Sequence, residues 1–316
     1  MPRALLPDAA QRPSNRRFHA AIAGLLALSI IVQAVRDRGW QPYQPATPVL
    51  WFQSGPLLKR FSLGFNNVIA DVYWIRAVVY YGSKRLAKDT TRNYDLLDPL
   101  LTFATTLDPQ FRVAYRFGAI FLTEAYPSGP GRPDRAIALL ERGLAANPNA
   151  WEYMYDIGFV HYWWLKNYKT AGQWFERASR LPGSPPWLPG LAATTMVEGG
   201  DRQSSRQLWR EIRETAAGDW FSRNAQLRLT QLDTMDMVDE LNKASQRFMV
   251  REGRPPRNEQ ELVLADKWLG WPNDPTGVPF VLDPVTGHIG VSRQSSLWPL
   301  PTDKGTVTAL PALLPR

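Results

Sequence analysis

The 316-residue chain contains no cysteine and only three histidines. Without cysteine it forms no disulfide, has no thiolate nucleophile and builds no cysteine-type zinc site. The histidines (His19, His161 and His288) have neither the spacing of metal ligands nor that of a catalytic triad. The glycine-rich loop followed by Lys-Ser/Thr that cradles phosphates is also absent. We therefore expect no metal site, no cofactor and no catalytic residues, and a protein that is not an enzyme.

A single basic face is missing as well, although the net charge is +8. Residues 1–38 hold six Arg and two Asp, which gives +4, and most other basic residues are interleaved with acids. A phosphate backbone requires basic residues gathered on one surface. We therefore expect no nucleic acid among the partners; a soluble RNA-associated repeat protein remains an alternative that cell fractionation distinguishes.

One segment near the N-terminus is apolar on every side. Residues 18–35 carry no formal charge, and 18 helical residues extend about 27 Å, close to the thickness of the hydrocarbon layer. This predicts a transmembrane helix between a basic cytoplasmic arm (1–17) and a proline-rich spacer (39–56). Four Arg before the segment and two after it predict a single-pass protein of the bacterial inner membrane, with its bulk in the periplasm. Small residues at 32–34 leave open a cleaved signal peptide.

A short pattern recurs three times between residues 93 and 182. Its members are spaced by three or four residues, which places them on one helical face, and each set ends at a proline. The three sets are Tyr94, Leu97, Leu101, Ala104 and Pro109; Ala136, Leu140, Gly143 and Pro148; and Tyr168, Ala171, Phe175, Ala178 and Pro182. The last two prolines are 34 residues apart, the period of a helix-turn-helix repeat.

These residues resemble the second helix of the tetratricopeptide repeat, and Gly118 and Gly158 match the glycine of its first helix. The loop at 126–133 is an insertion relative to that family, and His161 stands where a large apolar residue is usual. The resemblance implies a mostly α fold, an α-solenoid of antiparallel helix pairs over residues 57–218. In that family, first helices line a groove that takes a peptide or a partner's helix. The matching positions are Arg112, Tyr115, Leu122, Glu152, Tyr155, Phe159, Tyr162 and Trp163. For each, packing against the next repeat is the alternative.

Helices are also predicted before and after the repeats. The run at 68–81 is apolar nearly all round, so we expect it to be deeply packed, with Asp71 and Arg76 paired or facing a groove. Residues 187–198 and 202–215 form a fourth, degenerate pair, and residues 219–252 form a capping helix.

The C-terminal part changes character. Two turn motifs, Asn-Asp-Pro-Thr-Gly at 273–277 and Asp-Pro-Val-Thr-Gly at 283–287, predict a small α+β segment with a β-hairpin over 253–298, followed by an extended tail (299–316). The segment resembles the C-terminal part of type II secretion pseudopilins and type IV pilins, through Gly253 to Pro256, Glu261 to Val263 and Pro272 to Phe280. The pilin processing signal is missing. Some pseudopilins bind calcium in this region, so Asp274 and Asp283 are either calcium ligands or ordinary turn residues.

Together these patterns predict a membrane-anchored scaffold that binds a protein partner in its repeat groove and contacts the bilayer through residues 18–35. The pilin-like segment suggests a pilus, secretion or other cell-envelope assembly. An alternative is an enzyme, or an accessory subunit of one, that acts on envelope polymers, for which a deep pocket gathering Asp71 and Arg76 would be the sign.

Overall fold

The computed structural model describes residues 16–39, 55–87, 92–215 and 218–304. The chain divides into two compact units, 1–51 and 52–316. The elements of the described residues are α1 (Arg16–Gly39), α2 (Gly55–Phe61), α3 (Asn66–Leu86), α4 (Leu97–Leu107), α5 (Arg112–Thr123), α6 (Pro133–Ala146), α7 (Trp151–Trp163), α8 (Tyr168–Ser179), α9 (Leu188–Glu198), α10 (Arg202–Thr215), α11 (Asp219–Glu252), α12 (Glu259–Ala265), β1 (Val281–Leu282) and β2 (Ile289–Gly290).

The first unit contains helix α1. Its side chains are described for residues 21–35, and all of them are exposed, including Leu25 and Ile30. Most of the expected arm (1–17) and spacer (39–56) lies outside the described residues, at 1–15 and 40–54. Their described ends are helical, because α1 includes residues 16–17 and 39 and α2 includes residues 55–56. In the part of the chain that the structure describes, no helix is long and apolar enough to cross a membrane, so the spanning helix expected over 18–35 is not supported.

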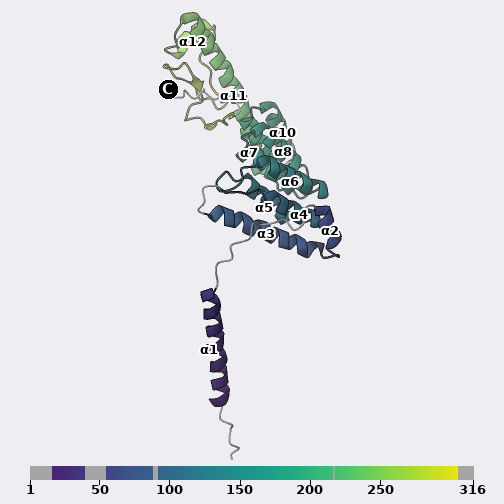
Figure 1. Ribbon diagram of the computed structural model, residues 1–316. Helices are drawn as coiled ribbons and strands as arrows, with labels where there is room; N and C mark the ends of the chain where they lie inside the picture. Colours follow the sequence, from purple (N-terminus) through teal and green to yellow (C-terminus); the bar gives the residue numbers. More distant parts are fainter. Residues whose placement is uncertain (1–15, 40–54, 88–91, 216–217, 305–316) are drawn as a thin grey trace, which may run out of the picture. The chain divides into compact units, whose positions relative to one another are not determined.

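The second unit is a stack of helices in chain order. Each helix from α3 to α11 packs against the next one, as in a helical-repeat solenoid (Figure 1). Local sequence sets several boundaries: Pro133 begins α6, where its missing N–H costs nothing, and the Asn167 side chain caps α8 by accepting from the Thr170 backbone N–H.

The repeated pattern forms the core of this stack. Leu97, Leu101, Ala136 and Leu140 are each fully buried, and Phe175 is 2% exposed. Glycine permits the closest approaches between helices. A Cβ on Gly158 would lie 2.6 Å from the ring of Phe175, so this glycine is where α7 contacts α8. The spacing therefore identified the packed faces of these helices.

Helix α3 departs from expectation. One face packs on α4 through Ala70, Tyr73, Ala77, Tyr80 and Tyr81. The opposite face is exposed: Val68, Val72, Ile75 and Val79 are 59%, 45%, 58% and 63% accessible. The prediction of a deeply packed helix was therefore wrong for one of its two faces. An apolar pattern shows that both faces of the helix are hydrophobic. It does not show whether other helices of this chain cover both of them.

The C-terminal part is built on the end of α11. Gly253, in the left-handed conformation with φ 69°, ends this 34-residue helix. Strands β1 and β2 then pair antiparallel, with Leu282 opposite Ile289, as the turn motifs predicted. A second core forms here from Leu241, Phe248, Leu262, Phe280 and Ile289.

The chain then returns to the helical stack. The Gln231 side-chain amide of α11 donates to the carbonyls of Leu297 and Pro299. Further on, the Lys304 ammonium lies 2.9 Å from the Glu198 carboxylate at the end of α9 and above the rings of Tyr162 and Tyr168. Residues 299–304 of the expected extended tail therefore lie against the helices; residues 305–316 lie outside the described part.

Candidate functional site

Two recesses lined by aromatic residues open on the helical stack. The first, of about 200 Å³, lies between α5 and α7. Its lining is Arg116, Ala119, Ile120, Thr123, Tyr155, Asp156, Phe159, Val160 and Trp164. The second, of about 290 Å³, lies among α9, α10 and α11. Its lining is Pro186, Trp187, Gly190, Leu191, Thr194, Trp209, Ile212, Trp220, Phe221, Asn224 and Arg228.

The two recesses are neighbours. The ring of Tyr155, which lines the first, meets the ring of Trp187, which lines the second, edge to face at 5.9 Å between centroids. We call the two recesses and this junction the aromatic groove. The Phe159 and Trp163 rings extend it along α7, since they stack in parallel with their centroids 6.3 Å apart.

An ion pair provides the polar part of the first recess. The Arg116 guanidinium binds Asp156 through two hydrogen bonds, Nε to Oδ2 at 2.5 Å and Nη2 to Oδ1 at 3.0 Å. Burial raises the pKa of Asp156 above its ordinary value, and the hydrogen bond and charge of Arg116 oppose that shift. The same hydrogen bond raises the pKa of Arg116. The pair links α5 to α7 and leaves one charged, hydrogen-bonding feature among apolar walls.

Several residues predicted for partner binding lie in or beside this groove. Tyr155 and Phe159 line the first recess, and Trp163 is 56% exposed next to them. Arg112 and Glu152 form an ion pair at 3.4 Å between the starts of α5 and α7. These five residues share the exposed side of the first helices.

The other three predicted residues lie elsewhere. Tyr115 and Leu122 are each only 2% exposed, so both are core residues and offer no surface to a partner. They lie one turn to either side of Gly118, at which an added Cβ would meet Leu101 and Leu139. Tyr162 packs edge to face on Tyr168 beneath Lys304 and so belongs to the contact with the returning chain.

The second recess was missed by sequence reasoning. It is built from three helices spread over 186–228, with exposed Trp187 (49%) and Trp220 (64%) at its edge. The available signal was the number of tryptophans, 13 in the chain, and their recurrence near the degenerate helix pair.

Asp71 and Arg76 do not gather in a pocket. Asp71 is exposed on α3, and Arg76 is half-buried with its guanidinium 5.2 Å from the centre of the Tyr73 ring. Neither lines a recess described here. The arrangement that would have favoured an enzyme of envelope polymers is therefore not formed by these two residues.

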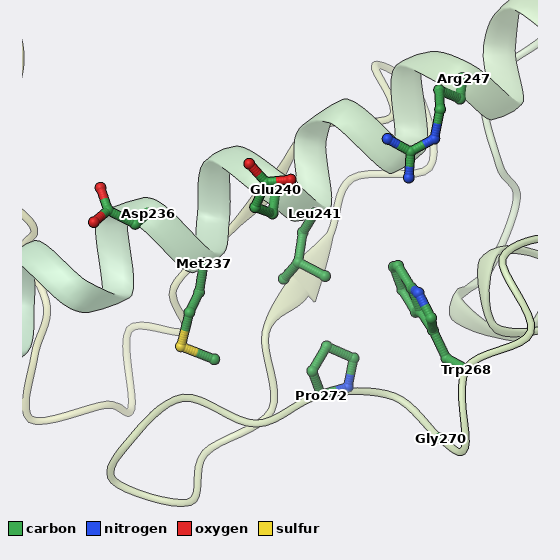
Figure 2. A pocket seen from close by; sticks show the side chains of 8 residues that line it. All are labelled: Asp236, Met237, Glu240, Leu241, Arg247, Trp268, Gly270 and Pro272. Atoms are coloured by element: carbon green, nitrogen blue, oxygen red, sulfur yellow. The ribbon is translucent and has the colours of Figure 1, made fainter.

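A third recess lies in the C-terminal part, between α11 and the loop at 266–272. It encloses about 570 Å³. In Figure 2, Met237 and Leu241 point from α11 toward Trp268 and Pro272, so the walls are apolar. Its charged residues already have partners: Asp236 binds Arg202 and Arg206, Glu240 binds Lys243, and Arg247 binds Asp266. The recess therefore suits an apolar group more than a charged one.

The two turn aspartates have their oxygens occupied by the chain itself. Asp274 is 5% exposed and accepts from the Thr276 and Val278 N–H groups and from the Thr276 and Ser295 hydroxyls. Asp283 accepts from the Val285 N–H and the Thr286 hydroxyl. Across the described residues, no group of three or more His, Asp or Glu is placed to hold a metal ion. This geometry is that of turn residues.

Comparison of the chain with models of protein families, with curated proteins and with solved structures found no match. The helical-repeat architecture is therefore assigned from the packing of successive helices alone.

Proposed function

We propose that this protein is a scaffold whose tetratricopeptide-like helices bind a protein partner in the aromatic groove. The observation that carries the proposal is the exposure of large aromatic side chains along the groove: Phe159 at 39%, Trp163 at 56%, Trp187 at 49% and Trp220 at 64%. Burying such side chains contributes much of the binding energy at protein interfaces, where Trp, Tyr and Arg are the usual anchors.

The size of the recesses favours a peptide or helix over a small molecule. Pockets for small ligands usually enclose about 300–1,000 Å³ and are few per protein. The groove instead offers two adjoining recesses of about 200 and 290 Å³, at or below the lower end of that range. Two neighbouring side-chain sites suit successive residues of one bound segment, and Arg116 with Asp156 adds a polar contact.

The cellular setting is the part of the proposal that rests on sequence. The apolar segment at 18–35 and its flanking arginines support attachment to the bacterial inner membrane with residues 52–316 in the periplasm. The pilin-like pattern in the segment 253–298 supports a pilus, secretion or other envelope assembly. Alkaline carbonate extraction tests the attachment, since release of the full chain into the soluble fraction would contradict it.

Two exposed tryptophans allow a matched test of the groove. Trp163 and Trp298 are 56% and 50% exposed, and each has a cation beside its ring, Lys166 at 5.0 Å and Arg293 at 5.9 Å. Partners are recovered from detergent-solubilised membranes with four proteins: the unchanged full chain, Trp163→Ala, Trp187→Ala and Trp298→Ala. We expect a partner with the unchanged chain and with Trp298→Ala, and a loss of affinity of roughly 30-fold for a groove variant, the size typical of an interface anchor. If all four recover the same proteins in equal amounts, the groove is not the binding site.

A further inference from the structure

The N-terminal end of the helical stack carries a second exposed apolar surface, separate from the aromatic groove. Along α3, Val68, Val72, Ile75 and Val79 recur at spacings of four, three and four, and Leu86 follows seven residues later. This spacing places them on one side of the helix, opposite the side that packs on α4. Their exposure runs from 45% to 82%. We call these five residues the α3 stripe.

The turn before α3 extends this surface. Leu63 and Phe65 are 86% and 65% exposed, between the end of α2 and the start of α3. Leu63 holds a positive φ of 48°, a backbone conformation that is unfavourable for leucine. This strained turn exposes Leu63 and Phe65 to solvent, so their burial does not contribute to the stability of the core of this chain.

One end of the surface is basic. Lys59 and Arg60 are exposed and precede the turn. At the other end of α3, Lys84 and Arg85 lie against the rings of Tyr80 and Tyr81, on the side away from the stripe. Among the described residues neither Lys59 nor Arg60 has an ion-pair partner. Asp71, three residues after Val68 and four before Ile75, is exposed beside the stripe.

We propose that α3 and the turn at 62–65 lie on an anionic lipid surface, with the stripe in the acyl boundary and Lys59 and Arg60 at the head groups. An apolar helix face bordered by Lys and Arg is the pattern of interfacial helices that bind anionic bilayers. Solenoid ends normally carry a polar outer face, so an apolar one indicates that something covers it. Lipid contact through α3 does not depend on residues 18–35 spanning a bilayer.

The charge distribution favours lipid over a parallel pair of chains. If two stripes paired parallel, Lys59 and Arg60 of one copy would face their counterparts in the other. This arrangement brings like charges together, which disfavours pairing. An anionic membrane neutralises these charges instead.

The absence of cysteine from the sequence makes a direct test practical. A single cysteine replaces Leu63 in one full-length variant and Val79 in another, and each carries a polarity-sensitive fluorophore. The matched control is Val285→Cys, at a hairpin position that is 81% exposed. On adding vesicles that contain phosphatidylglycerol, we expect a blue shift and quenching by spin-labelled lipid at positions 63 and 79, and neither at 285.

The charge requirement is tested separately. Each basic residue near an anionic surface strengthens binding by about fivefold, so Lys59→Gln with Arg60→Gln should weaken docking of the label at 79 by about 25-fold. The control replaces Arg223 and Lys243, whose side chains are 74% and 61% exposed on α11, by Gln and should leave docking unchanged.

Three outcomes would overturn the proposal. Labels at 63 and 79 that stay in water on anionic vesicles, in protein whose circular dichroism shows it folded, would exclude lipid contact. A blue shift without lipid that grows with protein concentration would assign the stripe to self-association. A shift produced only by lipid-free cell extract would assign it to a protein. None of these results bears on the aromatic groove, which the tryptophan variants test.

Discussion

Gly158 offers a quantitative test of the close contact between α7 and α8. Replacing a glycine inside a helix by alanine favours the helix by about 1 kcal/mol through backbone entropy alone. At position 158, however, the new Cβ would lie 2.6 Å from two ring atoms of Phe175, which is 2% exposed, and 3.2 Å from the Ala171 carbonyl oxygen. Overpacking of a dense core costs about 1–3 kcal/mol, and a contact this short, against a ring that has no free space, should lie near the upper end.

The expected net effect of Gly158→Ala is therefore a loss of about 1–2 kcal/mol in the free energy of unfolding. For a unit of this size that corresponds to a fall in Tm of roughly 2–8 °C. The matched control is Gly82→Ala in α3, where no atom lies within 4 Å of the new Cβ. There only the helix preference operates, and Tm should rise by roughly 2–4 °C.

Thermal unfolding of the full chain and both variants, followed by circular dichroism at 222 nm, measures the two shifts under one set of conditions. Opposite signs are the expected result. The reasoning would be refuted if Gly158→Ala raised Tm as Gly82→Ala does, because α7 and α8 would then not approach each other at this residue.

Three further predictions concern titration and metals. Burial lowers the pKa of His161, whose Nδ1 has no hydrogen-bond partner, so the folded state resists protonation of this side chain. The free energy of unfolding should therefore fall as the pH drops below about 6.5. His161→Phe should flatten this dependence, measured by urea titrations between pH 5 and 8. Burial alone would raise the pKa of Asp274, but hydrogen bonds from Ser295 and Thr276 lower it overall; its contribution is therefore present above about pH 3.9 and lost as the pH falls through the lower folded value. Asp274→Asn should weaken the C-terminal part by about 1–3 kcal/mol, seen as faster amide hydrogen exchange over 272–295. Because its oxygens and those of Asp283 already accept hydrogen bonds, millimolar Ca²⁺ or EDTA should leave Tm unchanged, and a clear rise with Ca²⁺ would contradict the turn assignment.

The packed faces of the repeats could be read from spacing alone. Ala171, Phe175 and Ala178 recur at helical intervals, and all three are buried as that pattern requires. The turn motifs likewise predicted the β-hairpin, because Asp, Pro and Gly favour particular backbone conformations. Both are local properties, which a sequence records directly.

The site was predicted only in part, for a physical reason that Tyr115 illustrates. A family position suggested that it faces a partner, yet it lies one turn from Gly118, on the side where α5 meets its neighbours, and it is buried. The second recess depends on three helices meeting around Trp187, which no local spacing encodes. For α3, the sequence is hydrophobic on both faces, and this pattern does not distinguish a helix that is covered on one face from a helix that is covered on both.

The return of the chain to Glu198 has an evolutionary consequence. Contacts in a repeat array join nearest neighbours, so such arrays ordinarily gain or lose units by duplication and deletion without disturbing the rest. Here Lys304 reaches Tyr162, Tyr168 and Glu198 on three successive helices at once. A unit duplicated between α8 and α9 would separate Glu198 from Tyr162 and Tyr168, so growth of the array should be tolerated only upstream of α7.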